Sequence, residues 1–399
     1  MKLKSLFITI NMFLFLSVAA QETKKYSFGE GVLNRVNKDS TYAIKIGARA
    51  QFLTASRWTS ANNTTNPVTF FSVRRARLKL DGFAITSRLQ YKLELGFTDK
   101  DISLPREFTN AVSRYFFDAV LKWNFSGNFV LWLGQAKLPG NRERVISSGD
   151  LQQVDRSLLN RVFNVDRGIG IQLRHHINIT KDFIVKEMFA ISQGEGRGIT
   201  TGNLGGYQYT ARIEVLPMGN FVENGDYVGS DLNFESTPKL ALGISYDLNN
   251  NAVKNRSNLG AYMKNDAGFF ETDVSTFFLD AMFKYKGFSF MGEYASRSAN
   301  DPIAKNYDGS LTGDIVQVGN GLNLQTGYLV SKTVELSGRY TNISLDKNIT
   351  GKGSENQYTL GVSKYIAGHK LKVQTDISYL DAQESNNEIM FRFQVDIHF

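Results

Sequence analysis

The 399-residue chain contains no cysteine and only 6 prolines, and its one long apolar run lies within the first 20 residues. The absence of cysteine excludes disulfides, a thiolate nucleophile and a cysteine-bound metal. A membrane-spanning helix needs about 20 consecutive apolar residues, so the rest of the chain is not a helical membrane protein. An aromatic content of 12% also excludes a disordered chain.

The chain is rich in glycine and aromatic residues and carries an excess of positive charge. It has 35 Gly, 29 Phe and 17 Tyr, and the formal net charge is +8. A basic protein can bind nucleic acid or an anionic surface. Here the basic residues are spread along the chain and form no arm or tail, so we expect no nucleic-acid partner.

Residues 1–20 have the features of a signal peptide. Lys2 and Lys4 precede a largely apolar stretch, which ends on the small residues Val18-Ala19-Ala20. This arrangement predicts export and removal of the segment. Residues 21–41 would then form a short N-terminal segment in the periplasm, and the exported chain would carry a net charge of +6.

From Tyr42 onward, apolar and polar residues alternate. The stretch 42–52, for example, places apolar side chains at even positions and mostly polar ones at odd positions. Such alternation gives a strand one apolar and one polar face. About 16 segments show it, each near the roughly 9–11 residues that a tilted strand needs to cross a bilayer. They are 42–58, 70–83, 87–99, 110–124, 128–139, 167–179, 183–193, 207–215, 239–249, 272–285, 288–298, 322–329, 334–343, 358–366, 369–379 and 387–399.

The connections between these segments alternate between long and short. The one exception is 216–238, which is long and acidic although a short turn is expected there. Short turns on one side and long loops on the other are typical of an outer-membrane barrel. The sequence therefore predicts an all-β fold: a transmembrane antiparallel β-barrel of about 16 strands over residues 42–399, with short periplasmic turns and long outer loops. Its lumen would be too wide for wall side chains to fill. The last segment alternates up to Phe399, as in outer-membrane proteins of Gram-negative bacteria.

Several segments also resemble the phosphate-selective porin O and P family of Gram-negative outer membranes. They are spread over residues 42–399 and comprise Arg74–Leu78, Leu133–Pro139, Ser157–Leu159, Asp166–Gly170, Tyr358–Gly361 and Gly368–Lys372. The resemblance implies a homotrimer of 16-stranded barrels in the outer-membrane lipid. It also implies that the third outer loop, residues 140–166, folds into each pore, and that phosphate is among the solutes.

Basic residues on the polar strand faces are the candidates for a pore lining. Several have no acid nearby on the same face, so this sector should be electropositive and attract anions. The pore-lining and anion-binding candidates are Lys45, Arg49, Arg75, Arg77, Lys79, Lys137 and Arg174. The third loop adds four candidates for the constriction, which are Arg142, Arg144, Arg156 and Arg161. Arg74 breaks the apolar face of its strand, and we interpret it as an interfacial residue.

Other functions find less support in the sequence. Acids and bases share the polar faces of many strands, which favours a general, weakly selective porin as the first alternative. A barrel whose outer loops bind a ligand or partner is the second. The 4 histidines have no metal-ligand spacing, so we expect no catalytic residue, metal or cofactor, and no enzyme. After removal of the signal peptide, the roughly 20 residues that remain before Tyr42 are too few for the plug domain of a gated transporter. The sequence thus predicts a diffusion porin for small hydrophilic solutes, with a preference for anions such as phosphate.

Overall fold

The structure, a computed structural model, describes residues 28–59, 66–105 and 107–399. The predicted signal peptide, residues 1–20, lies outside the described residues. Within them, none of the helices is long and apolar enough to cross a membrane.

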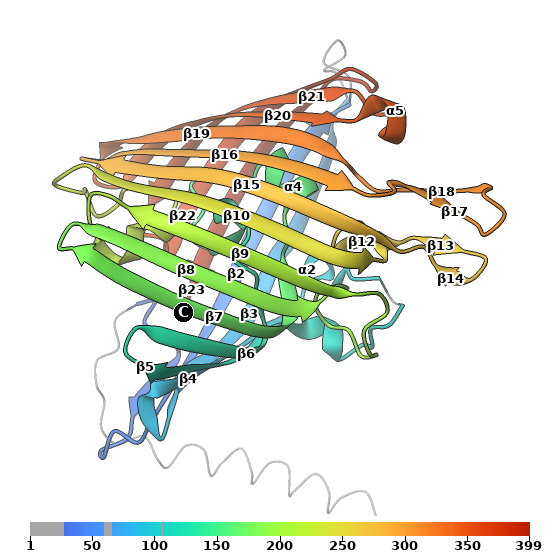
Figure 1. Ribbon diagram of the computed structural model, residues 1–399. Helices are drawn as coiled ribbons and strands as arrows, with labels where there is room; N and C mark the ends of the chain where they lie inside the picture. The colour runs from blue at the N-terminus through green and yellow to red at the C-terminus, as the bar shows by residue number, and fades with distance from the viewer. Residues whose placement is uncertain (1–27, 60–65, 106) are drawn as a thin grey trace, which may run out of the picture.

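Sixteen antiparallel strands form a closed barrel (Figure 1), which confirms the predicted fold class. Each strand pairs with its neighbours in sequence, and the barrel closes where the last strand pairs with the first, with Arg49 opposite His398. The strands are β2 (Tyr42–Trp58), β3 (Val68–Ala84), β4 (Thr86–Gly96), β5 (Phe116–Ser126), β6 (Phe129–Lys137), β7 (Arg167–Thr180), β8 (Phe183–Gln193), β9 (Tyr207–Leu216), β10 (Lys239–Ala252), β15 (Thr272–Tyr285), β16 (Phe288–Ala299), β19 (Gly319–Ser331), β20 (Val334–Leu345), β21 (Ser354–Tyr365), β22 (Leu371–Ala382) and β23 (Glu388–His398).

Most strand ends lie within a few residues of the predicted ones. The largest difference is β5, which was expected from residue 110 but begins at Phe116, because the residues before it form a short 3-10 helix, η2 (Ser113–Tyr115). The segment before the barrel also contributes a strand, β1 (Leu33–Val36), which pairs with residues 43–46 of β2. The strand β23 pairs with β2 only from Arg49 onward, so the earlier residues on the same edge of β2 can pair with β1.

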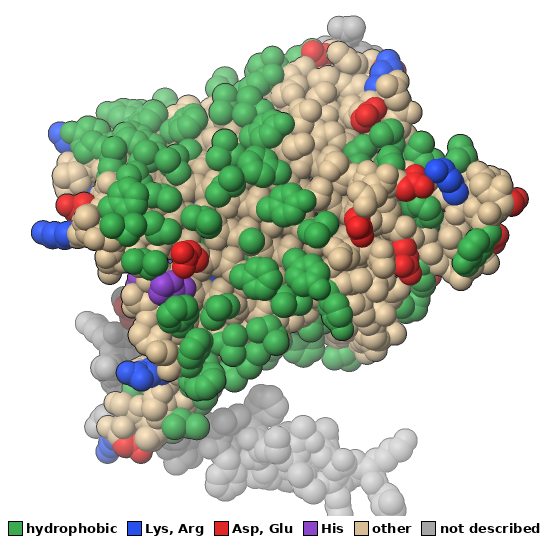
Figure 2. Space-filling view, in the orientation of Figure 1, with side chains coloured by type: hydrophobic (Ala, Val, Ile, Leu, Met, Phe, Trp, Pro, Cys, Tyr) green, Lys and Arg blue, Asp and Glu red, His purple; other side chains and the backbone are tan. Residues whose placement is uncertain are grey.

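The two faces of the wall separate lipid from the interior as predicted. Figure 2 shows a broad band of hydrophobic side chains around the middle of the barrel, with charged groups gathered toward its ends. Leu121, Ile244 and Leu360 belong to this outer surface. Inward-facing side chains such as Gln208 and Thr210 are buried. This distribution is that of a membrane barrel, whose outer face contacts lipid.

The long outer loops carry the remaining helices and hairpins. They include α2 (Asp99–Ile102), α5 (Lys347–Thr350) and the small strands β11 (Lys254–Arg256), β12 (Leu259–Tyr262), β13 (Lys264–Asn265), β14 (Gly268–Phe269), β17 (Ile303–Lys305) and β18 (Leu311–Ile315). The hairpins β13–β14 and β17–β18 project beyond the barrel (Figure 1). Backbone and side-chain hydrogen bonds join them, for example Tyr307 N donating to Asp266 Oδ1 at 3.0 Å.

The third loop, between β6 and β7, lies inside the barrel and contains α3 (Arg142–Val145) and α4 (Leu158–Phe163). The Ser157 side chain caps α4 by accepting a hydrogen bond from the Asn160 backbone N–H. The apolar residues of α4 pack on inward-facing wall residues, among them Phe278, Ala295 and Ile343. The loop therefore fills the lumen on the β15–β20 side.

The exceptional connection, residues 217–238 between β9 and β10, also folds inward. It contains the 3-10 segment η3 (Val222–Tyr227). Phe221 joins an apolar cluster with Ile146 and Leu151 of the third loop and with Met282 and Met291 of the wall. The inward course of this segment accounts for its unusual length.

Replacing Phe163 by alanine tests the packing of the third loop. Phe163 is fully buried, so Phe163→Ala should lower the free energy of unfolding by about 3–5 kcal/mol, which is usual for a buried Phe. Urea titration in detergent measures this loss. Leu311→Ala, at an exposed hairpin position, is the control and should change it by less than about 0.5 kcal/mol. Equal effects of the two substitutions would show that the loop does not share the core of the barrel.

Candidate functional site

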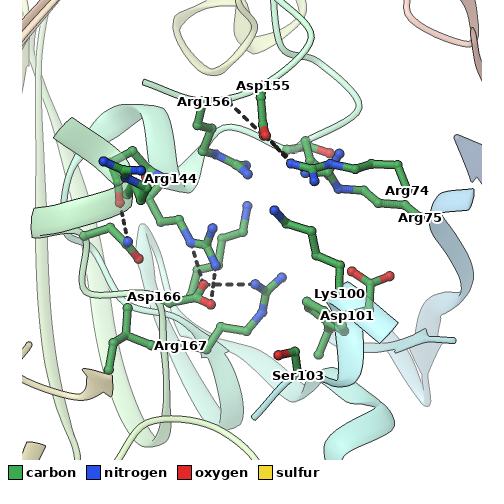
Figure 3. Close-up of a pocket in the computed structure, with 18 of the residues that line it drawn as sticks. Arg74, Arg75, Lys100, Asp101, Ser103, Arg144, Asp155, Arg156, Asp166 and Arg167 are labelled. Atoms are coloured by element: carbon green, nitrogen blue, oxygen red, sulfur yellow. Dashed lines mark hydrogen bonds and ion pairs between the residues drawn. The ribbon is translucent and has the colours of Figure 1, made fainter. Parts of the chain in front are cut away.

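The lumen retains a water-accessible cavity of about 740 Å³ between the third loop and the β2–β7 side of the wall. Its lining is strongly basic: sixteen Lys or Arg side chains face it, against six Asp or Glu. In Figure 3, Arg74, Arg75, Lys100, Arg144 and Arg156 point toward one another from the wall, the second loop and the third loop. The basic residues are Arg57, Arg74, Arg75, Arg77, Lys92, Lys100, Lys122, Lys137, Arg144, Arg156, Arg161, Arg167, Arg174, Arg197, Arg256 and Arg392.

A β-bulge in β3 turns two successive arginines into this cavity. Gln51 of β2 pairs with Arg75, whereas the next residue, Phe52, pairs with Val73, so Arg74 is the extra residue. Such a bulge interrupts the alternation of faces. Both guanidinium groups reach Asp155 of the third loop: Arg74 forms an ion pair with it, and Arg75 lies 3.8 Å from it. The interpretation of Arg74 as an interfacial residue was therefore wrong.

The cavity's carboxylates are held by neighbouring arginines. Asp166, at the end of the third loop, accepts hydrogen bonds from Arg144 Nε at 2.7 Å and from Arg167 Nη1 at 3.0 Å. Burial alone would raise the pKa of the Asp166 carboxyl, but the charges of Arg144 and Arg167 outweigh it and hold this pKa well below its ordinary value. The acid therefore stays ionised, and its charge is already neutralised.

Three cations of the cavity have neutral partners instead. Lys137 donates to the carbonyl oxygens of Val145 and Ile146, at 3.0 and 3.2 Å. Arg156 donates to the carbonyls of Glu143 and Ile146, at 2.9 and 2.7 Å. Arg174 donates to the amide oxygen of Gln172 at 2.8 Å, and its guanidinium lies 3.9 Å from the centre of the Trp132 ring.

None of these three side chains forms an ion pair with a carboxylate of the described residues. Carbonyl and amide oxygens orient a cation without cancelling its charge. Lys137, Arg156 and Arg174 therefore supply net positive charge to the cavity, and all three were candidates from the sequence.

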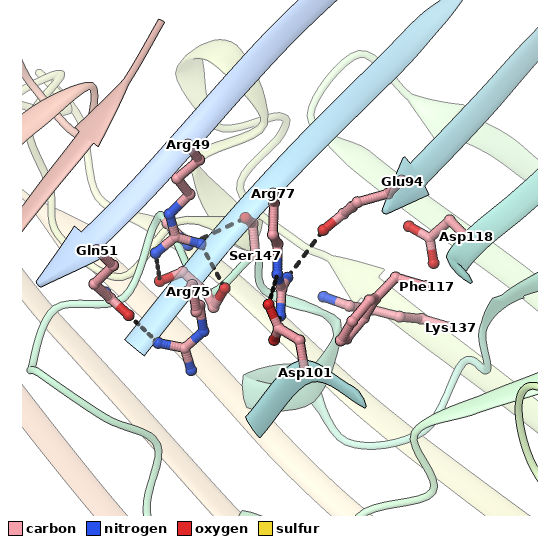
Figure 4. A network of polar contacts seen from close by, with 12 residues as sticks. Arg49, Gln51, Arg75, Arg77, Glu94, Asp101, Phe117, Asp118, Lys137 and Ser147 are labelled. Carbon is pink, nitrogen blue, oxygen red and sulfur yellow. Dashed lines mark hydrogen bonds and ion pairs between the residues drawn. The ribbon is translucent and has the colours of Figure 1, made fainter. Parts of the chain in front are cut away.

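Two other predicted residues, Arg49 and Arg77, are neutralised in contacts that hold the wall and loops together (Figure 4). Arg77 lies in the cavity lining, 2.9 Å from Glu94 and 2.8 Å from Asp101 of the second loop. Arg49 forms an ion pair with Asp396 at 2.6 Å and donates to the Ser148 carbonyl of the third loop at 3.0 Å. These arginines position the loops around the cavity.

The remaining strand candidates are divided between the cavity and other sites. Arg75 lines the cavity and bonds Gln51 in the wall. Lys45 and Lys79 lie outside the cavity lining. Lys79 forms an ion pair with Asp81 at 2.8 Å, and 49% of its side chain is exposed.

The loop candidates divide in a similar way. Arg144, Arg156 and Arg161 line the cavity, and Arg161 also forms an ion pair with Glu355 at 3.1 Å. Arg142 does not line it. Its fully buried guanidinium bonds Glu214 at 3.0 Å and Asp280 at 2.8 Å, so it anchors the loop to the wall.

Several cavity residues were not found from the sequence. Lys100 and Arg197 lie on the second and fourth outer loops, where no alternation indicates direction. Arg197 donates to the Phe116 carbonyl at 3.1 Å and stacks 4.0 Å from the Phe117 ring centre. Arg167 shares the odd numbering of the outward-facing Ile171, yet it pairs with Asp118 inside the barrel at 2.7 Å. The alternation of faces along β7 therefore predicted, wrongly, that Arg167 faces outward.

Comparisons with known proteins agree with this barrel. The family model described as phosphate-selective porin O and P matches residues 55–390. An uncharacterized protein of Aquifex aeolicus is 22% identical over 375 residues, which cover 85% of this chain and 82% of that protein.

Two solved outer-membrane structures share the fold. The first is OmpT of Vibrio cholerae, 11% identical, covering 92% of this chain and 100% of that one with a TM-score of 0.54. The second is an anion-selective porin from Comamonas acidovorans, 13% identical, covering 90% of this chain and 100% of that one with a TM-score of 0.53. The chain is a multi-pass β-barrel of the outer membrane.

The charge of Lys100 should make the cavity sensitive to alkaline pH. Its side chain lines the cavity and is exposed there. Partial desolvation by nearby protein, together with the charges of Arg74 and Arg75, lowers the pKa of Lys100 despite the opposing charge of Asp155. A lysine with a lowered pKa loses its charge at a lower pH than usual. Anion preference, measured as a reversal potential, should therefore fall as pH is raised toward about 10.4, the ordinary pKa of lysine.

Lys100→Arg should lose less of the preference over this range than the natural protein, because arginine stays charged up to a pH of about 12 whereas the other lysines of the cavity still titrate. Lys79→Arg, outside the cavity, is the control and should follow the natural protein. The account of Lys100 fails if Lys100→Arg loses preference with pH as the natural protein does.

Proposed function

The chain belongs to the phosphate-selective porin O and P family, and we propose that it is a diffusion porin that prefers small anions such as phosphate. Channel function follows from the family, whose members are porins rather than enzymes. The observation that carries the anion preference is the charge of the cavity, where sixteen basic side chains face six acidic ones. The solved anion-selective porin with the same fold is consistent with it.

The mechanism is passive flow through a path lined by fixed cations. An anion that enters the cavity loses part of its hydration shell and forms hydrogen bonds with the N–H groups of Lys137, Arg156 and Arg174 in its place. Arginine suits phosphate because its planar donors can bind two oxygens at once, whereas lysine acts as a point charge. A cation finds carboxylates such as Asp166 already bound to arginine, so it meets net repulsion.

The rest of the lumen contributes little net charge. Inward-facing ions outside the cavity form pairs, among them Arg212 with Glu214 of the same strand at 2.6 Å and with Asp280 of β15 at 2.7 Å. A weakly selective porin would result if mobile ions screened the excess charge of the cavity, since the Debye length is about 8 Å at physiological ionic strength. The balance of charge on the remaining wall supports the proposal that the selectivity of the pore arises in the cavity.

A homotrimer in the outer-membrane lipid is part of the proposal, on the ground of family membership. The mass of the protein–detergent complex measures it directly. We expect three chains for each particle, and a particle containing one chain would contradict this part of the proposal without affecting the charge of the pore.

Removing the two cations held by carbonyls tests the anion preference. Reversal potentials in planar bilayers under a KCl gradient should lie on the anion side for the natural protein. Lys137→Met and Arg156→Met should each lower the ratio of anion to cation permeability about threefold. A unit charge about 7 Å from an ion contributes roughly 0.3 kcal/mol once salt screening halves its value in pure water, and the sign is opposite for anions and cations.

Lys79→Met is the matched control, because it removes one positive charge outside the cavity and should have a smaller effect. Phosphate should also reduce the chloride current of the natural protein more than that of the Arg156→Met variant. A natural protein with a reversal potential near zero or on the cation side would contradict the proposal and leave a general porin.

A further inference from the structure

Residues 217–238 form an acidic segment inside the periplasmic mouth. The segment contains four Asp or Glu residues and no Lys or Arg. The other described connections at this end are much shorter, for example 127–128 and 286–287. Phe221, Asp226 and Ser230 are each at most 4% exposed. One side of the segment is thus packed against the interior of the barrel, while residues such as Val222 and Phe234 remain exposed.

Polar contacts fix the segment to opposite parts of the wall. Asp226 forms an ion pair with Lys186 of β8 at 2.7 Å. Ser230 Oγ donates to Glu335 of β20 at 2.7 Å, and its carbonyl oxygen accepts a hydrogen bond from Lys284 of β15 at 2.6 Å. Asp231 accepts a hydrogen bond from the Gly287 backbone N–H at 2.7 Å. The segment therefore crosses the mouth from β8 to β20.

The same segment contacts the third loop from below. The Gly229 backbone N–H donates to the Asp150 carbonyl at 2.8 Å. Arg142 Nη1 donates to the Asp226 carbonyl at 2.9 Å and lies 5.3 Å from the centre of the Tyr227 ring. Tyr227 also donates to Glu214 at 2.6 Å, and Glu214 is the carboxylate that binds Arg142. The two inward segments thus share one anchor.

Apolar wall residues beneath the two segments support the same arrangement. Ile184, Met282 and Met291 point inward, where a water-filled lumen would require polar groups. They are covered by Phe221 of the segment and by Ile146 and Leu151 of the third loop. Exposing these side chains to water would cost about 25 cal/mol for each Å² of apolar surface. The apolar side chains of this part of the wall are therefore stable only while the two inward segments cover them.

The cavity lies away from the covered half. Its lining includes no described residue of 217–238, nor of the wall strands β8–β10, β15, β16, β19 and β20. We propose that residues 217–238 form a second constriction, which closes the β8–β20 half of the lumen together with the third loop and confines solutes to the basic half. This inference rests on the channel function of the proposal above but not on its anion preference.

The covered half would conduct differently if it were open. It contains the carboxylates of Glu214, Asp280, Glu293 and Glu335, all buried beneath the two segments. Removing 217–238 would widen the pore and expose some of these acids to ions. Conductance should rise, and anion preference should fall, because ions of both signs would gain a path that lacks the excess positive charge of the basic half.

Replacing residues 218–237 by a short Gly-Asn turn tests this inference. Folding is first verified by the heat-dependent shift of the folded band in electrophoresis. Single-channel conductance in KCl should then rise by less than about twofold, because the third loop still fills part of the opened half. The reversal potential should move toward zero. An unchanged conductance in the folded variant would overturn the inference.

A point variant keeps the test independent of that deletion. Asp226→Asn with Tyr227→Phe removes the ion pair to Lys186 and the hydrogen bond to Glu214 with little change in volume. It should increase fluctuations of the open-channel current toward higher conductance. Glu223→Gln is the matched control, because it removes one acidic charge at an exposed position of the same segment. Equal current traces for the two variants would contradict the inference.

The outcomes also separate this inference from the anion proposal. If the natural protein shows no anion preference but the deletion raises conductance, the second constriction stands and the preference fails. If the natural protein prefers anions but the folded deletion variant conducts like it, the preference stands and the second constriction fails.

Discussion

A fully buried guanidinium, that of Arg142, determines where the third loop can lie. It bonds Glu214 and Asp280 of the wall, and Arg212 bonds the same two carboxylates at 2.6 and 2.7 Å. Removing one partner of such a buried cluster typically costs about 3–5 kcal/mol, because an uncompensated charge remains. The loop is therefore held against β9 and β15, and the open space of the lumen is left on the opposite side, along β2–β7.

This asymmetry gives the two halves of the lumen different chemistry. On the β8–β20 side, Arg142 and Arg212 pair with Glu214 and Asp280, and apolar residues pack under the inward segments. On the β2–β7 side, Lys137, Arg156 and Arg174 have only neutral acceptors. The carbonyls that hold Lys137 and Arg156 belong to the loop fixed by Arg142, whereas Arg174 is held by Gln172 of the wall strand β7. The anchoring of the third loop on the β8–β20 side thus keeps two of the cations on the β2–β7 side in place without neutralising them.

The strands and their faces could be predicted because a membrane wall imposes a strict alternation on the sequence. The same alternation identified Arg75, Arg77, Lys137 and Arg174 as residues of the cavity lining. It failed at Arg74, where a bulge adds one residue to β3. Residue types do not reveal a local break in the pairing register. The only indication in the sequence of this strand is one charged residue on an otherwise apolar face.

Loop residues were harder to place because no periodicity governs them. Arg142 and Arg144 lie two positions apart, yet the first is buried in the wall contact and the second lines the cavity. Lys100 and Arg197 reach the cavity only because their loops fold over it. The length of 216–238 was visible in the sequence as an exception, but its inward course depends on contacts with distant strands.

The position of bound anions is the most direct test of the central claim that a basic path runs along the β2–β7 side of the lumen. Crystals of the protein soaked in bromide should show anomalous peaks beside Lys137, Arg156 and Arg174, and none in the half covered by the third loop. Bromide found throughout the lumen, or absent from the cavity, would contradict the account.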